Sequence, residues 1–307
     1  YNHADSNDHC TYSYNLVHCN PFWDWWIIVN SSWHSVQTKY VLGKEYQYCT
    51  DAMTFNRIFT VHGTTLIFLF IIPFASAVGN YFVPIMVRYK DMAYPKLNAI
   101  AFWMIPPAGA LIWLSFADFG WYAQAPYSVI SSPAPAADMW IFGLKILGVS
   151  SILGAINFIV TILKCKHPDL PLSKVPLLGW SFLSSSLIML VAMPTFAAAL
   201  LMLLTDRLGV TGFFNPAMGG DPIAYSHLFW FTFHPEVYVL VIPAIGMMYD
   251  IIPRFSRKPI FSQGSGIAAF IILSIVSFAS WAHHMYATGM SFTEKTVFMV
   301  GTPQIGR

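Results

Sequence analysis

Charged side chains are scarce in this sequence, and their scarcity excludes most classes of soluble protein. Asp, Glu, Lys and Arg make up 10% of the 307 residues, whereas a soluble globular domain carries about 25%. Hydrophobic residues account for 56% of the chain, and its mean hydropathy is +0.56. We therefore predict an integral membrane protein. The formal net charge of +2 gives no reason to expect a nucleic-acid partner.

Cysteine is rare as well. The four cysteines are Cys10, Cys19, Cys49 and Cys165. Their spacing matches neither a zinc site nor a disulfide framework, so we interpret them as unpaired thiols. Residues 1–20 have no basic start and no apolar core, which argues against a signal peptide.

Six long apolar stretches are predicted to cross the membrane as helices, because each can span about 30 Å of hydrocarbon. The fold class is therefore all-α, a polytopic transmembrane helix bundle with about six spanning helices. Residues 1–52 are polar and irregular, and residues 53–307 form the predicted transmembrane region. We expect residues 1–50 to pack poorly against the helix bundle. The predicted spans are 64–87, 97–119, 138–163, 176–205, 225–250 and 264–288.

Basic residues are concentrated in alternate loops, which predicts a topology. Loop 120–137 contains no Lys or Arg, and loop 206–224 contains only Arg207. Basic loops face the cytoplasm or its equivalent, so residues near 60, 225 and 288 should lie toward the outer surface. The basic residues of the other loops are Arg88, Lys90, Lys96, Lys164, Lys166, Lys174, Arg254, Arg257 and Lys258.

Three histidines stand in otherwise apolar stretches on the predicted outer side: His234, His283 and His284. Polar groups at membrane depth are expensive and usually functional. The side chains of adjacent helical residues point about 100° apart. His283 and His284 can therefore bind one ion only if it lies in the space between their two directions. His234, on a neighbouring helix, can supply the third ligand to that ion. Neutral imidazoles suit copper, zinc or iron. The alternative is that each histidine hydrogen-bonds a backbone carbonyl.

Two further polar residues follow His234 on the same predicted helix. Tyr238 lies four residues later and shares its face, so its phenol can give an electron and a proton beside a metal. Glu236 is an acid inside a membrane helix, which indicates a proton relay. The alternative for Tyr238 is an ordinary membrane tyrosine without a role at a metal. The alternative for Glu236 is a carboxyl whose hydrogen bonds are made by the backbone or by water.

Weaker signals come from His62, which is followed by Gly63, and from Asp91 in a predicted inner loop. Taken alone, His62 is typical of a core histidine and Asp91 of a solvated loop charge. Asp91 can collect protons at the inner mouth of the bundle. Asn80 and Asn98 lie near the inner helix ends and can hold ordered water.

Taken together, these residues resemble those of the haem-copper oxidase family. The resemblance is to subunit I of cytochrome c oxidase and of its quinol-oxidising relatives. The resemblance covers about residues 50–300. The motifs that carry it are Phe59 to Thr65, Asp91 to Asn98, Trp140 to Thr161, His227 to Tyr238 and Trp281 to Met290.

The resemblance implies a role for each candidate residue. His62 would be an axial ligand of the low-spin haem iron, and His234, His283 and His284 would hold copper facing a high-spin haem. Tyr238 would be cross-linked to His234. Glu236 would be the branching proton donor, supplied from Asp91 through Asn80 and Asn98. Trp121 and Trp230 would line the haem region.

The implied activity is the reduction of O2 to water with electrons from cytochrome c, coupled to proton pumping. The implied cofactors are a copper ion and two haems, and the implied partners are subunits II and III, cytochrome c or a quinol, and O2. A prokaryotic cell membrane is favoured over the mitochondrial inner membrane. Alternatives are a quinol oxidase, a nitric oxide reductase of the same superfamily, or a non-enzymatic or inactive membrane bundle.

The sequence departs from the family in several places. Phe233 stands where the family usually has Gly, and Tyr249 where it often has Ser. No first family helix is evident in residues 1–52, and one interpretation is that this segment is not native to the family. The family fold has about twelve helices, and the later ones carry the remaining haem ligands. We therefore expect a partial chain, truncated at its C-terminal side.

Overall fold

The structure, a computed structural model, describes residues 52–130 and 135–301. This part of the chain forms helices and no strands, which confirms the predicted all-helical bundle. Five helical stretches are long and apolar enough to cross a membrane, and a sixth, shorter apolar helix covers Gln263–Ser277. The expectation of poor packing for the N-terminal segment concerns residues 1–50, which lie outside the described residues.

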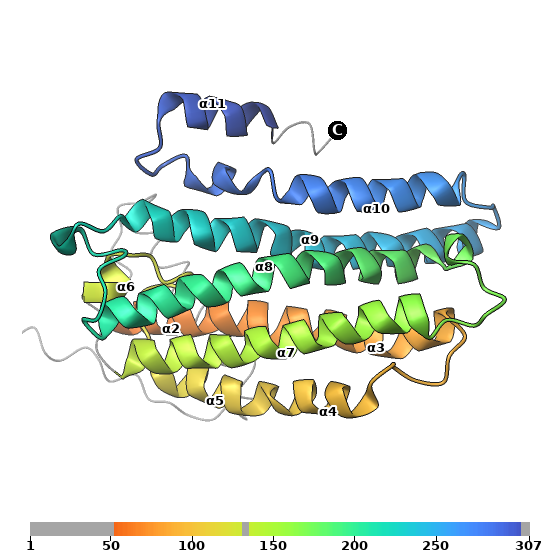
Figure 1. Cartoon of the computed structure of the whole chain (residues 1–307), viewed down its shortest axis with the longest axis horizontal. Helices are drawn as coiled ribbons and strands as arrows, with labels where there is room; N and C mark the ends of the chain where they lie inside the picture. The colour runs from red at the N-terminus through yellow and green to blue at the C-terminus, as the bar shows by residue number, and fades with distance from the viewer. Residues whose placement is uncertain (1–51, 131–134, 302–307) are drawn as a thin grey trace, which may run out of the picture.

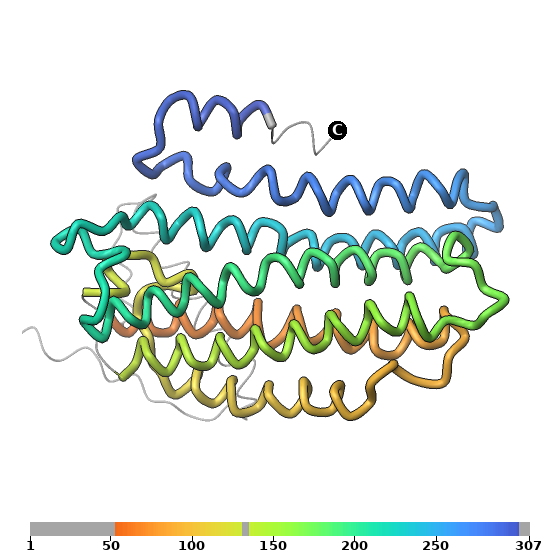
Figure 2. Tube along the Cα trace, viewed as in Figure 1, coloured from red at the N-terminus to blue at the C-terminus, as the bar shows by residue number. Residues whose placement is uncertain are grey.

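The long helices lie side by side and alternate in direction (Figure 1). The connections α3–α4, α7–α8 and α9–α10, which hold the basic residues, meet at one end, and a tube view of the same trace shows these reversals (Figure 2). The α-helices are α2 Ala52–Thr64, α3 Ile72–Met86, α4 Pro95–Trp103, α5 Ile105–Ser115, α6 Tyr127–Ile130, α7 Ala136–Lys164, α8 Leu177–Arg207, α9 Pro222–Ser256, α10 Gln263–Ser277 and α11 Phe292–Gly301. The π-helix η1 covers Thr65–Ile71, and 3-10 helices cover η2 Leu172–Lys174, η3 Pro216–Met218 and η4 Trp281–Met285.

Helix α9 carries four of the candidate residues, Trp230, His234, Glu236 and Tyr238, and its ends follow from local sequence. The Asp221 side chain accepts a hydrogen bond from the Ile223 N–H, and Pro222 occupies the first turn, where a missing N–H costs nothing. The helix ends at Arg257, which adopts the left-handed conformation at φ 55°. Between these ends α9 packs along α8, which fixes its position in the bundle.

The first span begins earlier than predicted. Helices α2, η1 and α3 follow one another without a break from Ala52 to Met86, whereas the sequence predicted a start at residue 64. His62 therefore lies in the last turn of α2, inside the continuous stretch, and its predicted place at the outer start of a helix is wrong. Polar residues such as Asn56 and Arg57 depress the hydropathy of the first turns without ending the helix.

The predicted single helix over 264–288 is also wrong. Helix α10 ends at Ser277, and the paired histidines lie in the separate 3-10 helix η4. Three serine hydroxyls donate to main-chain carbonyls near this break: Ser274 to Phe270, Ser277 to Ser274 and Ser280 to Val276. Such bonds compete with regular helix geometry, so the chain tightens before the histidines.

Candidate metal centre

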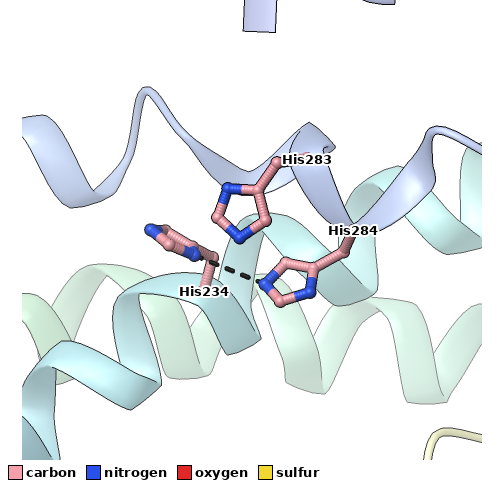
Figure 3. A group of neighbouring side chains, drawn as sticks. All are labelled: His234, His283 and His284. Carbon is pink, nitrogen blue, oxygen red and sulfur yellow. Dashed lines mark hydrogen bonds between the residues drawn. The ribbon is translucent and has the colours of Figure 1, made fainter. Parts of the chain in front are cut away.

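Three imidazole rings converge between α9 and η4 (Figure 3). His234 on α9 is buried with 5% exposure, His283 is half-buried and His284 is exposed. One nitrogen from each ring lies within 4.8 Å of the other two. The closest approach joins His234 Nδ1 and His284 Nε2 at 3.4 Å. The structure thus brings together the three histidines that the sequence singled out, although their helical setting differs from the prediction.

The donor set fits one metal ion. Three nitrogens bound to one ion at about 2.0–2.1 Å lie roughly 3.3–3.6 Å apart in a tetrahedral or trigonal arrangement, so the 4.8 Å separation must shrink by about 1.5 Å at most to close the set. Nδ1 is the His234 nitrogen that faces His284, whereas Nε2 is buried without a hydrogen-bond partner in the described part of the chain. An unpaired buried nitrogen calls for a physical explanation, and an ordered water at Nε2 supplies one. Three neutral imidazoles suit a first-row metal such as copper.

Aromatic rings surround the three histidines. The Tyr238 ring lies 5.0 Å from that of His234, centroid to centroid. Trp230 stacks on His284 with centroids 4.1 Å apart and an interplanar angle of 11°. Trp121 contacts Trp230 edge-on at 5.9 Å. Tyr238, Trp121 and Trp230, all named from the sequence, therefore lie within two ring contacts of the histidines.

Glu236 lies one turn of α9 further inward than Phe233 and is 2% exposed. Neither of its carboxylate oxygens has a hydrogen-bond partner among the described residues. A buried charged carboxylate without partners is very unfavourable, so this group must hold a proton or bind water. Both conditions are compatible with a group that receives and releases protons.

Asp91, Asn80 and Asn98 line a common cavity of about 900 Å³. Ser150 and Ser151 of α7 also line it, and its nearest lining residue on α9 beyond Glu236 is Val239. Asn80 Oδ1 is buried without a partner. Polar atoms without partners in a roomy cavity are sites for bound water. The residues that the sequence linked as a proton path thus share one cavity, and Glu236 lies next to its lining.

Sequence reasoning gave no role to Asn157, although it lies within a motif. Its Oδ1 accepts the Tyr94 N–H at 2.9 Å, and its Nδ2 donates to the Tyr94 carbonyl at 3.2 Å. Four residues later, Thr161 Oγ1 accepts the Ala93 N–H at 2.9 Å. Helix α7 therefore holds the loop that contains Asp91. The sequence contained one indication of this contact, because an Asn and a Thr four residues apart lie on the same face of an otherwise apolar helix.

His62 on α2 is not a member of the three-histidine group. It is half-buried, and its neighbour Gly63 lies against Trp121. A Cβ atom at Gly63 would be 3.0 Å from Trp121 Cβ, which is tighter than most real contacts. Glycine is therefore required by the close approach of Trp121.

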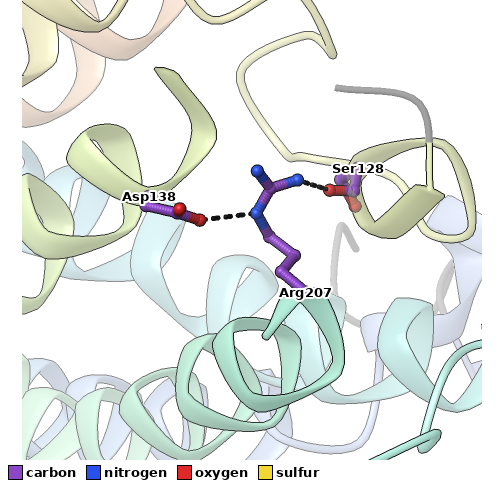
Figure 4. A network of polar contacts seen from close by, with 3 residues as sticks. All are labelled: Ser128, Asp138 and Arg207. Carbon is purple, nitrogen blue, oxygen red and sulfur yellow. Dashed lines mark hydrogen bonds and ion pairs between the residues drawn. The ribbon is translucent and has the colours of Figure 1, made fainter. Parts of the chain in front are cut away.

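An ion pair between the buried Arg207 guanidinium and the 23%-exposed Asp138 carboxylate ties α8 to α7, and Figure 4 shows it from close by. Arg207 of α8 donates from Nε to Asp138 Oδ1 of α7 at 2.6 Å and from Nη1 to the Ser128 carbonyl at 2.6 Å. The Arg207 side chain is only 5% exposed. The sequence showed Arg207 only as an isolated charge in its loop.

The two departures from the family lie in different surroundings. Phe233 is 3% exposed and packs inside an aromatic group, whereas Tyr249 is 41% exposed, with its ring 6.2 Å from that of Phe270. A further contact that the sequence did not reveal joins Trp281 Nε1, as donor, to His227 Nδ1 at 3.2 Å. It fixes η4 against the start of α9.

Comparison with known proteins identifies one matching family and several relatives. The family model described as "Cytochrome C and Quinol oxidase polypeptide I" matches residues 25–305, so the match begins within the segment 1–52. Cytochrome c oxidase subunit 1 from Synechocystis sp. is 42% identical over 252 residues, covering 81% of this chain and 46% of the relative.

Two other relatives give similar values. Cytochrome c oxidase subunit 1 from Thermostichus vulcanus is 42% identical over 257 residues, covering 82% of this chain and 46% of the relative. Cytochrome c oxidase polypeptide 1 from Halobacterium salinarum is 43% identical over 252 residues, covering 80% and 42%. The chain thus spans less than half the length of each of these three relatives.

Proposed function

The chain belongs to the cytochrome c and quinol oxidase polypeptide I family, and on that premise we propose that it forms part of the catalytic subunit of a respiratory terminal oxidase. This subunit reduces O2 to water at a haem-copper centre with electrons from cytochrome c, coupled to proton pumping. The family and the apolar helices make the chain a multi-pass membrane protein, and bacterial relatives support a prokaryotic membrane.

The observation that carries the proposal is the convergence of His234, His283 and His284, each of which places one ring nitrogen within 4.8 Å of the other two. In this proposal the three imidazoles hold the copper ion. Copper changes oxidation state by single electrons, which zinc cannot do. Trp230 stacks on His284 and restricts the orientation of its ring.

The remaining residues of the chain handle protons and haem. Tyr238 holds a proton on its phenol oxygen beside His234, and the geometry allows the cross-link between their rings. Glu236 receives protons that enter at Asp91 and pass the cavity lined by Asn80 and Asn98. The buried, unpaired Glu236 oxygens support this assignment.

His62 supplies one axial ligand of the low-spin haem, and Trp121 and Trp230 line the haem region. The other axial ligands and the electron-transfer partners belong to parts of the oxidase outside this chain. Those partners include subunits II and III. A quinol is a second candidate donor, because the matching family covers quinol oxidases as well as cytochrome c oxidases.

The test uses the full oxidase purified from its membrane. His283→Ala should lower bound copper well below one ion per subunit by elemental analysis, because one ligand of three is lost. His167→Ala is the matched control, since His167 lies in an exposed loop at the opposite end. Unchanged copper in His283→Ala would support a non-enzymatic bundle.

The wild-type enzyme should consume O2 with reduced cytochrome c. Uptake of nitric oxide instead, or oxidation of a quinol alone, would identify one of the related activities. An enzyme that binds copper but consumes neither gas would contradict the oxidase proposal.

A further inference from the structure

Lys145 is the only charged residue of α7 between Asp138, near the start of the helix, and Lys164, its last residue. The Lys145 side chain is half-buried and makes no hydrogen bond or ion pair with any other residue that the structure describes. Asp138, the nearest acid along the helix, is engaged by Arg207 at 2.6 Å. A charged side chain at membrane depth is costly without a partner. Lys145 therefore calls for a counter-charge from outside the described residues.

Lys145 lies below the membrane surface but within reach of it. Helix α7 has 29 residues, so it is about 43 Å long, against about 30 Å of hydrocarbon. If both ends protrude equally, each does so by about 7 Å, and Lys145 lies about 7 Å inside the hydrocarbon boundary at the Asp138 end. Helical side chains tilt toward the N-terminus, and lysine carries its ammonium on a flexible four-carbon stem. The Lys145 ammonium can therefore extend to the boundary at this end.

The face of α7 that carries Lys145 is apolar, bulky and open. Phe142, three residues earlier, is 50% exposed, and Val149, four residues later, is 48% exposed. Residues three and four apart share a helix face, whereas the adjacent Leu144, at 1% exposure, points into the bundle. Helices that pack together in membranes prefer small residues at their contact. Large apolar side chains around Lys145 therefore favour lipid chains over a further transmembrane helix as its neighbour.

The side of the membrane follows from the loops. The connection that follows α7 contains Lys166 and Lys174, and basic loops face the cytoplasm or its equivalent. The Asp138 end, toward which Lys145 extends, therefore faces the outer leaflet. Phosphate groups lie at that level, and their charged oxygens accept hydrogen bonds from an ammonium. Basic side chains at a membrane boundary bind lipid headgroups in this way.

We propose that Lys145 binds the phosphate of an anionic phospholipid in the outer leaflet, and that an acyl chain of this lipid lies on Phe142 and Val149. The Lys145 Nζ donates hydrogen bonds to the phosphate oxygens. A net negative lipid fits better than a zwitterionic one, because a zwitterionic headgroup brings its own cation to the phosphate. The site uses no residue of the metal centre, so its test is independent of the proposed function.

The experiment compares Lys145→Met and Lys145→Arg with the wild type in the complete oxidase. Met keeps an apolar chain without the charge, and Arg keeps the charge. Lys174→Met is the matched control, because Lys174 is an exposed lysine in the connection at the other end of α7. The proteins are placed in nanodiscs of mixed phosphatidylglycerol and phosphatidylcholine. Native mass spectrometry counts the lipids and subunits that stay bound, and cryo-electron microscopy locates headgroups on the wild type.

The wild type, Lys145→Arg and Lys174→Met should each retain one phosphatidylglycerol that Lys145→Met loses, and phosphatidylcholine should not replace it. Headgroup density should lie within hydrogen-bonding distance of Lys145 Nζ in the wild type. Equal phosphatidylglycerol counts in the wild type and Lys145→Met would overturn the proposal.

A protein partner would give a different result. If Lys145 binds a carboxylate on a transmembrane helix of another subunit, Lys145→Met should lose that subunit rather than a lipid, and this outcome also overturns the proposal. If Lys145→Met does not assemble, the wild-type map decides alone. A headgroup beside Lys145 would then support the lipid site, and its absence would refute it.

Discussion

The buried pair of Arg207 and Asp138 should be one of the most sensitive points of the fold. Asp138→Ala removes the carboxylate that receives Arg207 Nε at 2.6 Å, while the 5%-exposed guanidinium stays in place. Removing one partner of a fully buried ion pair costs about 3–5 kcal/mol, and because the Asp138 side chain is 23% exposed and Arg207 keeps its bond to the Ser128 carbonyl, we expect a loss near the lower end, about 3 kcal/mol. Asp138→Asn keeps an oxygen acceptor but loses the charge, so we expect a loss of about 1.5–3 kcal/mol, the range of a charge-assisted hydrogen bond.

A matched control exists in the exposed pair of His167 and Asp169, whose side chains are 46% and 85% exposed. Asp169→Asn should change the unfolding free energy by about 0–1 kcal/mol, as is usual for surface pairs. The assay is SDS titration of the purified protein in mixed micelles, followed by circular dichroism. If Asp138→Ala is no more destabilising than Asp169→Asn, the pair does not hold α7 to α8 as described.

A double replacement separates the cost of the lone charge from the value of the pair. Asp138→Leu combined with Arg207→Met removes both charges and keeps apolar volume between the helices. Because buried pairs are often no better than apolar replacements, the double variant should be less destabilised than Asp138→Ala alone. The opposite order would show that the pair itself contributes net stability.

Two further predictions concern other polar contacts. Asn157→Leu should release the loop that contains Asp91, since the Tyr94 N–H loses its acceptor and the Tyr94 carbonyl keeps only the Asn98 N–H as a donor. Hydrogen exchange at Ala93 and Tyr94 should then rise while exchange in the middle of α8 stays unchanged. Hydrogen bonds from the Ser291 side chain and main chain hold the pKa of the Glu294 carboxyl below its ordinary value near 4.5. The stability that the ionised carboxyl adds to the start of α11 is therefore fully present above that ordinary value, and it is lost as the pH falls through the lowered pKa. Exchange of α11 amides should therefore rise in that acidic window, and Ser291→Ala should move the rise to higher pH; an unchanged profile would refute the linkage.

Hydropathy predicted the central parts of the helices because lipid requires long apolar segments with internal hydrogen bonds. It failed at boundaries. The start of α2 contains polar residues that remain helical, and the end of α10 is set by serine hydroxyls that bind nearby carbonyls. Neither effect changes the average hydropathy of the stretch enough to be visible.

The candidate site was predictable in part. His234, His283 and His284 were found because imidazoles are unusual in apolar stretches, and they converge even though η4 replaced the expected helix. The enclosure of Phe233 and the partner of Arg207 depend on segments distant in sequence. Their contacts arise from tertiary packing, which no local pattern encodes.

The three histidines belong to elements of very different strength. Helix α9 is held along its length by α8, whereas η4 packs through a small cluster of three buried residues, its own Ala282 and Met285 together with Met290. An ion that binds all three imidazoles would therefore join a firm support to a weakly anchored turn. A ligand that binds only the folded state stabilises that state. Metal binding would therefore increase mainly the stability of η4 and of the residues that follow it. Metal delivery during biogenesis would then also be a folding step for the last part of this chain.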